Sequence, residues 1–269
     1  MKISAAIPCF NVVKTLARAV ASVRAQTCPA AELVVVDDGS TDATRSLAAE
    51  LGARVVVHAA NLGRGAARAT AMQECAGEFV LFCDAGIALP SAFVEMALPL
   101  MDDPAVAGVF GPVAAGGGTV VERWRARHLF RSGARRERRP DLLATGGALL
   151  RRGAVLAEGN FNRHLRSGED AELGERLNAA GQRVLFDPRL ELAPLSGDSV
   201  ATVLQRYARW NGQKHPSWSD YLRFINYGVK VMMRADLEER DWGAAMISLA
   251  SPHVLFWHSR RTSNRARPS

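Results

Sequence analysis

Short apolar runs alternate with helix-spaced apolar residues along the first 110 residues of the chain. Continuous apolar runs are typical of parallel strands that are buried on both faces. They predict strands at residues 3–7, 33–36, 54–57, 79–82 and 106–110. Helical spacing between them predicts helices at residues 15–26, 66–75 and 91–101. A further helix is expected to end at Leu51, with Ser40 or Thr41 as its N-terminal cap.

This order of elements predicts an α/β fold with a doubly wound, mostly parallel sheet. Strands and helices alternate through short turns, and such connections form right-handed crossovers that place helices on both faces of the sheet. Polar clusters follow the predicted strands, at residues 8–11, 37–42, 61–68 and 84–86. Because ligands bind such sheets beyond the carboxyl ends of the strands, we expect a ligand site at that edge.

The pattern loosens after Gly111, where Gly116, Gly117 and Gly118 predict a flexible loop. A short apolar run follows at residues 149–150. Further on, the spacing predicts a helix over residues 170–180 that Gly181 ends, and then a strand at 184–186. We expect one sheet domain over residues 1–197, with halves at 1–110 and 111–197.

Residues 198–269 predict a helical C-terminal extension with a basic tail. Helices are expected at residues 200–210, 218–234 and 242–257, the last broken at Pro252. The longest apolar stretch in this region is short and interrupted by Pro252, so we expect no membrane-spanning helix.

The composition is that of a folded globular protein. Of the 269 residues, 48% are hydrophobic and 23% are charged, which argues against disorder as the main state. The four cysteines show neither C-x-x-C nor zinc-site spacing, and the N-terminus shows no signal-peptide pattern. We therefore expect reduced thiols and a cytoplasmic location. The net charge is +7, and lysine occupies only four of the 34 basic positions.

Five motifs, in this order, resemble those of glycosyltransferase family 2. They are Ile-Pro-Cys-Phe-Asn at 7–11, Val-Val-Val-Asp-Asp-Gly-Ser-Thr-Asp at 34–42, Asn-Leu-Gly-Arg-Gly-Ala-Ala-Arg at 61–68, Phe-Cys-Asp-Ala-Gly at 82–86 and Gly-Glu-Asp-Ala-Glu-Leu at 168–173. The resemblance spans residues 1–190 and implies a GT-A fold and an inverting transferase that uses a nucleotide sugar. Residues 1–110 would then form its nucleotide-binding half, and 111–197 its acceptor-side half.

The resemblance also implies which residues bind the nucleotide of the donor. They are Pro8, Asn11, Asp37, Asp38, Arg64, Arg68 and Asp84. Asp37 and Asp38 could accept hydrogen bonds from the base and the ribose of a UDP-sugar. Arg64 and Arg68 lie near a helix N-terminus, where cations and free N–H groups favour phosphate. The alternative interpretation of residues 37–42 is an ordinary strand-to-helix turn.

Asp84 occupies the first position of the Asp-x-Asp motif of the family. Two carboxylates there would bind the ribose and a divalent metal, Mg²⁺ or Mn²⁺, that neutralises charge on the departing diphosphate. In this sequence Gly86 replaces the second acid, and residues 190–197 lack the histidine that the family often provides. The sequence therefore leaves Asp84 as the single expected metal ligand and argues against a complete metal site.

Asp170 is the expected catalytic base. The resemblance places the base at the second acid of the Glu169-Asp170 pair, where a carboxylate can take the proton of an acceptor hydroxyl. Glu169 would shape the acceptor side of the site together with Gly146 and Gly147. The alternative is a simple helix start, where acidic residues are favoured by the helix dipole.

These expectations define an inverting glycosyltransferase that acts by a single displacement, in cell-envelope or natural-product glycosylation. The first alternative is a non-catalytic homologue that binds nucleotide sugars with a degenerate metal site. A sugar-phosphate nucleotidylyltransferase is a weaker alternative, because residues 8–11 do not form a glycine-rich phosphate loop.

The expected partners are a nucleotide-sugar donor and an acceptor of unknown structure. Residues 122–139 hold eight arginines and could receive an anionic acceptor or anionic lipid, or form a solvated loop. The helix at 242–257 could lie in a membrane interface, at the inner face of the membrane, or pack within the protein. We expect no nucleic-acid binding, and the sequence leaves the oligomeric state open.

Overall fold

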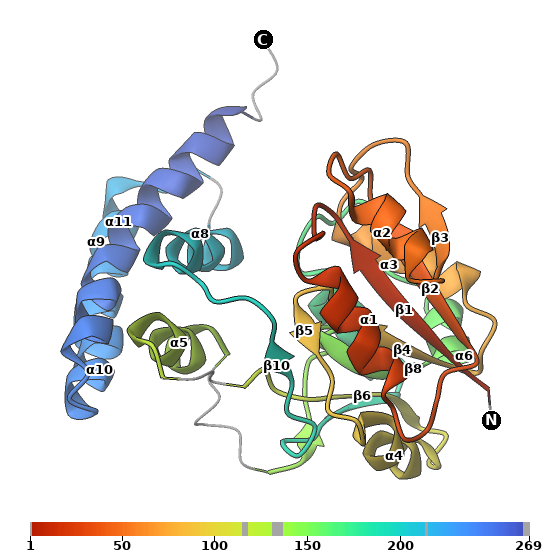
Figure 1. Cartoon of the computed structure of the whole chain (residues 1–269). Helices are drawn as coiled ribbons and strands as arrows, with labels where there is room; N and C mark the ends of the chain where they lie inside the picture. Colours follow the sequence, from red (N-terminus) through yellow and green to blue (C-terminus); the bar gives the residue numbers. More distant parts are fainter. Residues whose placement is uncertain (1, 115–117, 131–136, 213–214, 266–269) are drawn as a thin grey trace. The chain divides into compact units, whose positions relative to one another are not determined.

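The computed structural model describes residues 2–114, 118–130, 137–212 and 215–265. The chain forms two compact units (Figure 1). The first unit comprises Met1–Ala114 and Arg135–Ser196, and the second comprises Ala115–Ala134 and Gly197–Ser269. The first unit ends beside the predicted boundary at residue 197, but residues 115–134, expected in the acceptor-side half, group with the C-terminal helices. Of the three glycines in the expected loop, Gly116 and Gly117 lie outside the described residues.

The first unit is built on a mixed, mostly parallel sheet of eight strands in the order β3-β2-β1-β4-β8-β6-β9-β7. The strands are β1 (Ile3–Cys9), β2 (Glu32–Asp37), β3 (Arg54–Val57), β4 (Phe79–Cys83), β6 (Val106–Phe110), β7 (Arg139–Pro140), β8 (Gly147–Arg151) and β9 (Arg183–Phe186). The first four strands are parallel, whereas β8 runs antiparallel to both of its neighbours, β4 and β6. A small second sheet pairs β5 (Ile87–Ala88) with β10 (Ala193–Pro194).

Helices cover both faces of this sheet and confirm the doubly wound α/β prediction. They are α1 (Leu16–Arg24), α2 (Thr44–Glu50), α3 (Arg64–Glu74), α4 (Phe93–Ala97), the 3₁₀ helix η1 (Leu98–Met101), α6 (Arg152–Ala157) and α7 (Glu169–Ala179). Alternate residues of a strand enter different cores: Leu81 packs with residues of α1 and α4, and Phe82 with residues of α3, α6 and α7. This alternation explains why the strands are continuous apolar runs.

The start of α2 differs from the prediction. The helix begins at Thr44, and neither Ser40 nor Thr41 caps it. Asn11, which has a positive φ of 52°, accepts hydrogen bonds from the backbone N–H groups of Thr41 (2.8 Å) and Asp42 (3.3 Å). Ser40 Oγ in turn accepts from the Asn11 N–H at 2.9 Å. These long-range bonds hold residues 40–42 as a loop and delay the helix.

The second unit is helical. Its elements are α5 (Val120–Arg125), the π-helix η2 (Ala126–Phe130), α8 (Val200–Asn211), α9 (Trp218–Tyr227), the π-helix η4 (Gly228–Met233), α10 (Arg234–Glu238) and α11 (Trp242–Arg265). Trp124 is fully buried in its core beside Val203 and Tyr207. The placement of Trp124 explains why residues near 120–130 join this unit.

Three arginines of the arginine-rich segment form ion pairs inside the second unit. Arg123 pairs with Asp241, Arg125 with Asp198 and Arg127 with Asp236. These side chains therefore fasten residues 123–127 to α10 and to the segments that precede α8 and α11, which neither interpretation of residues 122–139 anticipated. Residues 131–136 of that segment lie outside the described part of the chain.

Helix α11 continues through Pro252, where the sequence predicted a break. Proline has no N–H, so it leaves the Ser248 carbonyl without its usual helical donor. The Ser251 hydroxyl donates to that carbonyl at 2.9 Å, and the proline ring packs closely on Gly228. Within the described residues, no helix is both long enough and apolar enough to span a bilayer.

Gly65 brings the start of α3 against the chain segment that leads to α7. A Cβ atom at Gly65 would lie 2.1 Å from the Asn162 carbonyl oxygen and 2.6 Å from that of Leu165. We expect Gly65→Ala to lower the free energy of unfolding by about 1–3 kcal/mol or more, because both neighbours are backbone atoms.

Chemical denaturation of both variants would test this expectation, with Gly153→Ala as the matched control. A Cβ at Gly153 meets no described atom within 4 Å, and the residue lies in α6. The control should be neutral or stabilising by up to about 1 kcal/mol. Equal stability of the two variants would contradict the close packing of α3.

Candidate functional site

The loops after β1 and β2 are joined at the carboxyl edge of the sheet. Asn11 binds residues 40–42 as described above, and the Val12 N–H donates to Thr44 Oγ1 at 2.8 Å. Asp37 is buried at the end of β2, where its Oδ1 accepts from the Ser40 N–H at 3.1 Å. Pro8 lies beside Val36 in the register of β1 and β2. The first two motifs therefore form one connected rim.

Asp38 fastens the third motif to this rim. Its Oδ1 accepts from the Leu62 N–H at 3.0 Å, and its Oδ2 accepts from the Gly63 N–H at 2.8 Å. His58 Nδ1 lies 2.7 Å from the same Oδ1. Asp38 is 4% exposed, and both of its carboxylate oxygens are engaged by these three groups of the protein. Its carboxylate thus holds the turn that starts α3.

Helix α3 in turn contacts the segment before α7. The Gly65 N–H donates to the Leu165 carbonyl at 3.1 Å. Arg166 reaches back to Asn61, with its Nη1 3.1 Å from Oδ1 and its Nη2 3.0 Å from the carbonyl oxygen. This contact places the Glu169-Asp170 pair, at the start of α7, beside the middle of α3.

Arg68 of α3 connects the two distant acidic motifs. Its guanidinium donates from Nη2 to Asp84 Oδ1 at 2.7 Å and from Nη1 to Glu169 Oε1. Arg68 is 3% exposed and Glu169 1% exposed, so this is a buried ion pair. Among the described residues, Arg68 Nε and Glu169 Oε2 have no hydrogen-bond partner. The cluster therefore contains one unpaired buried donor, Arg68 Nε, and one unpaired buried acceptor, Glu169 Oε2, within the described part of the chain.

The charges in this cluster influence one another strongly. Burial is the largest influence on Arg68 and opposes its charge, but Asp84, Glu169 and Asp170 outweigh it and raise the pKa of Arg68. Burial also raises the pKa of Glu169, by more than Arg68 lowers it. Arg68 therefore remains charged, and burial keeps the pKa of Glu169 above that of a free glutamic acid.

Asp84 and the Gly146-Gly147 segment lie side by side. Strands β4 and β8 pair Cys83 with Gly147, and the Asp84 N–H donates to the Gly146 carbonyl at 2.8 Å. The Asp84 side chain is 36% exposed, which makes it far more accessible than Glu169. Gly86, two residues further on, has open space: a Cβ there would meet no described atom within 4 Å.

Asp170 lies beside Thr145, directly before the same glycines. Its Oδ2 accepts from the Thr145 N–H at 3.3 Å and from the Thr145 hydroxyl at 3.4 Å, and its Oδ1 accepts from the Ala171 N–H at 3.0 Å. Unlike Glu169, Asp170 is only partly buried. Of the two adjacent acids, Asp170 is thus the more exposed.

The structure brings together most of the predicted site residues. Arg68, Asp84, Glu169, Asp170 and Gly146 form one cluster, in which Gly147 occupies the adjoining strand. Arg64 lies exposed one helical turn before Arg68 and acts electrostatically on Glu169.

The remaining predicted residues lie on the connected rim. They are Pro8, Asn11, Asp37 and Asp38. Three further residues, Thr145, His58 and Arg166, were not predicted, because their contacts come from strands and loops distant in sequence. Their only sequence signal was their position beside a motif.

Among the described residues, the cluster contains the carboxylates of Asp84, Glu169 and Asp170 around the guanidinium of Arg68, and the exposed Arg64 adds a weaker positive influence on Glu169. Within the described residues, no group of three or more His, Cys, Asp or Glu side chains could hold a metal ion. Asp84 therefore offers one accessible carboxylate in an acidic environment. This donor set fits a Mg²⁺ or Mn²⁺ ion held mainly by water and substrate phosphates.

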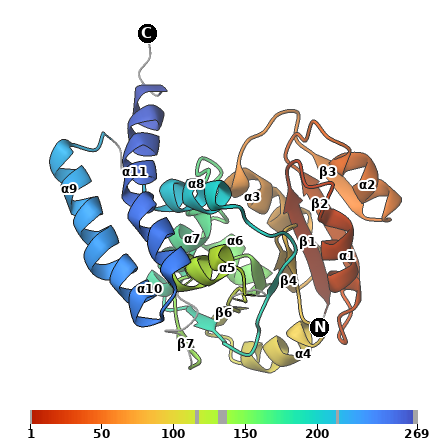
Figure 2. The same ribbon diagram turned by 60° about the vertical axis from the view of Figure 1, so that its left-hand side comes forward.

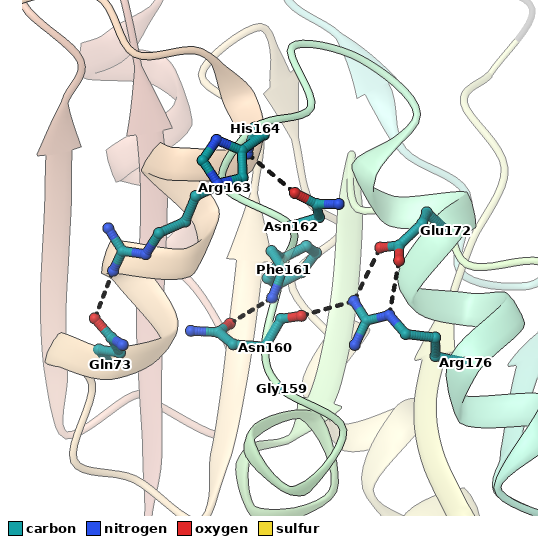
Figure 3. Close-up of a pocket in the computed structure, with 9 residues that line it drawn as sticks. All are labelled: Gln73, Gly159, Asn160, Phe161, Asn162, Arg163, His164, Glu172 and Arg176. Carbon is teal, nitrogen blue, oxygen red and sulfur yellow. Dashed lines mark hydrogen bonds and ion pairs between the residues drawn. The ribbon is translucent and has the colours of Figure 1, made fainter.

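A separate pocket of about 390 Å³ lies between α3 and α7 (Figure 3). Its residues are Gln73, Gly159, Asn160, Phe161, Asn162, Arg163, His164, Glu172 and Arg176. Arg176 Nη2 donates to the Asn160 carbonyl at 2.7 Å, and Arg163 Nη2 to Gln73 Oε1 at 2.6 Å. These bonds hold the loop that packs on Gly65. The pocket contains none of the predicted site residues.

Comparison with known sequences agrees with this arrangement. The family model described as glycosyl transferase family 2 matches residues 4–157, more than half of the chain. The pre-mycofactocin glycosyltransferase of Mycobacterium tuberculosis is 28% identical over 226 residues, which cover 80% of this chain and 47% of that protein. The chain thus spans about half the length of this relative.

Two solved structures share the fold. TarS 1-349 of S. aureus in complex with UDP-GlcNAc has a TM-score of 0.58 at 18% identity, covering 98% of this chain and 91% of that chain. The mannosyltransferase PcManGT of Pyrobaculum calidifontis, in complex with GDP-Man and Mn²⁺, has a TM-score of 0.59 at 17% identity, covering 100% and 76%. At such identities the likeness establishes the GT-A fold alone.

The buried pair of Arg68 and Glu169 generates a stability prediction. Arg68→Met removes the guanidinium and leaves a buried carboxylate unpaired, so we expect the free energy of unfolding to fall by about 3–5 kcal/mol. The double variant Arg68→Met, Glu169→Gln should lose less than the sum of the single variants. Urea denaturation measures all three.

Arg54→Met is the matched control, because it removes an exposed ion pair with Glu74. Its cost should stay below about 1 kcal/mol. Additive effects of Arg68→Met and Glu169→Gln, or a cost for Arg68→Met no larger than that of the control, would show that the two side chains are not coupled.

Proposed function

Because the chain belongs to glycosyltransferase family 2, we propose that it transfers a sugar from a nucleoside diphosphate donor to an acceptor hydroxyl, with inversion at the anomeric carbon. The observation that carries this proposal is the cluster around Arg68. It joins Asp84 at one sheet edge to Glu169 and leaves the neighbouring Asp170 accessible. Arg68 thereby brings Asp84, proposed for the donor, close to the start of α7, where Asp170 is proposed to face the acceptor.

Asp170 is the proposed general base. As the acceptor oxygen attacks the anomeric carbon, a carboxylate oxygen of Asp170 takes the hydroxyl proton. The bond between the anomeric carbon and the diphosphate oxygen breaks at the same time, and its electron pair leaves with the nucleoside diphosphate. Glu169 is less suited to this role, because it is buried and paired with Arg68.

We propose that the nucleotide of the donor binds at the rim formed by the loops after β1 and β2 and at the start of α3. We propose that Pro8, Asn11 and Asp37 border the base and the ribose, and that Asp38 acts by holding the 62–63 turn in place. Arg64 is exposed at the start of α3, where it could meet the diphosphate. The complexes of TarS with UDP-GlcNAc and of PcManGT with GDP-Man support a nucleoside diphosphate donor. We propose UDP as the nucleotide of that donor.

Asp84 is the residue that would hold a divalent metal. When bound, Mg²⁺ or Mn²⁺ would neutralise charge on the leaving diphosphate. The residues of the chain itself keep this carboxylate in place: Arg68 orients it through Oδ1, and the backbone of Asp84 is fixed to Gly146. The presence of Mn²⁺ in the PcManGT complex supports this assignment.

One observation favours a second candidate function. Asp84 is the single acid of its motif, and Gly86 leaves open space where a second carboxylate would lie. A homologue that binds nucleotide sugars without transferring them would need no complete metal site. Binding without turnover, across donors and acceptors, would favour this alternative.

The proposed base is tested with a panel of nucleotide sugars. We expect at least one donor to raise the melting temperature and to be hydrolysed or transferred, with the product in the opposite anomeric configuration. Asp170→Asn should lower the transfer rate by about 10²–10⁴-fold and leave donor affinity nearly unchanged, because it removes only the proton acceptor.

Glu175→Gln is the matched control on the same helix, since Glu175 is exposed and outside the cluster. It should keep both the rate and the affinity. Turnover by Asp170→Asn at the control rate would refute Asp170 as the base. A panel with neither thermal shift nor turnover would refute the transferase itself.

Gly86→Asp tests the metal assignment by adding the missing carboxylate. The backbone at Gly86 does not require a glycine conformation, and the side chain would enter open space. We expect Mn²⁺ to bind the variant in the presence of nucleotide at least about tenfold more tightly than the parent, since a second hard oxygen ligand is added. Isothermal titration calorimetry measures this affinity.

Gly153→Asp, in open space on α6, is the control and should leave Mn²⁺ binding at the parental level. Equal Mn²⁺ affinity for parent, Gly86→Asp and control would show that residues 84–86 do not face the ion. The stability of each variant is checked by thermal melting.

A further inference from the structure

Two helices of the second unit leave large apolar side chains exposed. Helices α9 and α11 run side by side, and both views show their pairing (Figure 1 and Figure 2). None of the ten residues of α9, all of them described, is buried. Six exposed side chains define what we call the α9–α11 surface: Trp218, Leu222, Trp242, Met246, Leu249 and Trp257.

The exposed residues of α11 follow helical spacing. Trp242, Met246, Leu249 and Trp257 recur on one face, and His253 lies between the last two. Trp242 is 73% exposed and Met246 66% exposed. The opposite face of the same helix enters the core of the unit through residues such as Ile247. A helix that is apolar on both faces is typical of a protein interior or of a helix in contact with lipid.

Aromatic contacts join the two helices into one surface. The ring centroids of Trp218 and the buried Phe256 lie 5.2 Å apart, and those of Phe256 and Trp257 lie 5.5 Å apart. Arg260 lies over the Trp218 ring at 5.7 Å. Trp218 and Trp257 are therefore held in place by neighbouring side chains although they are exposed. Binding through these two rings would cost little further side-chain entropy.

The charges around the α9–α11 surface are mainly basic. Residues 242–265 contain no acidic residue, and Arg260 and Arg261 are exposed near the end of α11. Lys230 is exposed on η4. Of the acids in this region, Asp220 and Glu238 each pair with an arginine of their own helix, and the exposed Glu239 is followed by the exposed Arg240.

Two further acids, Asp236 and Asp241, are buried in pairs with Arg127 and Arg123. They contribute no negative charge at the surface. The α9–α11 surface thus combines exposed tryptophan, methionine and leucine with exposed cations.

We propose that the α9–α11 surface binds the anionic face of a lipid bilayer, with both helices lying in the plane of the membrane. Tryptophan rings are favoured at the headgroup level, and methionine and leucine enter the acyl boundary. Exposed arginine and lysine side chains attract anionic headgroups. This charge complementarity selects anionic lipid over a neutral apolar partner. The inference is independent of the proposed transferase activity.

Sedimentation with phospholipid vesicles tests the proposal on the full chain. We expect binding to vesicles that contain phosphatidylglycerol, weaker binding at high salt, and little binding to pure phosphatidylcholine. The triple variant Trp242→Ser, Met246→Ser, Leu249→Ser should lower the partition coefficient by at least about tenfold. Arg260→Gln with Arg261→Gln should weaken binding mainly at low salt.

Val57→Ser with Val200→Ser is the matched apolar control, since both side chains are exposed outside this surface. Arg45→Gln with Lys14→Gln is the charge control on the first unit. Neither control should change binding. If the triple variant fails to fold, Trp242→Ala alone, with intrinsic tryptophan fluorescence as the second readout, carries the same test.

Equal binding of the parent and the triple variant would overturn the proposal, and so would an absence of binding to anionic vesicles. A dimer in light scattering that the triple variant abolishes, without vesicle binding by the parent, would also overturn it. That result would assign the surface to a second copy of the chain.

Discussion

The site depends on one buried interaction, the contact of Arg68 with Asp84 and Glu169. Without the guanidinium, the buried Glu169 would lose its partner and would repel the partly exposed Asp84. With it, two motifs that are far apart in sequence share one charged group. The remaining loops serve to place Arg68: Asp38 holds the turn before α3, and Gly65 lets α3 approach the segment that leads to α7.

The two adjacent acids at the start of α7 differ in burial and in their partners. Glu169 is buried and neutralises Arg68, whereas Asp170 stays accessible beside Thr145. In the Glu-Asp pair at the start of α7, one residue thus completes the internal ion pair and its neighbour keeps a partly exposed carboxylate.

The sequence alone predicted the strands of the parallel half and the clustering of polar loops at their carboxyl ends. Short continuous apolar runs between turn residues are typical of buried parallel strands, and Gly181 has the positive φ expected after α7. Prediction from the sequence failed where contacts between residues distant in sequence determine the local structure. Asn11 delays α2, Ser251 and Gly228 carry α11 through Pro252, and Trp124 draws residues near 120–130 into the second unit. The engagement of Asp38 by Leu62 and Gly63 is equally invisible in the sequence, because it depends on tertiary packing.

A crystal structure of the chain with a bound nucleoside diphosphate sugar would test the central claim most directly. The account predicts that the diphosphate lies at Asp84 and the start of α3, with the anomeric carbon open to attack from the side of Asp170 while Arg68 keeps both of its acidic partners. A donor bound in the separate pocket beside Gln73 and Arg176, or a sugar whose anomeric carbon faces away from Asp170, would contradict it.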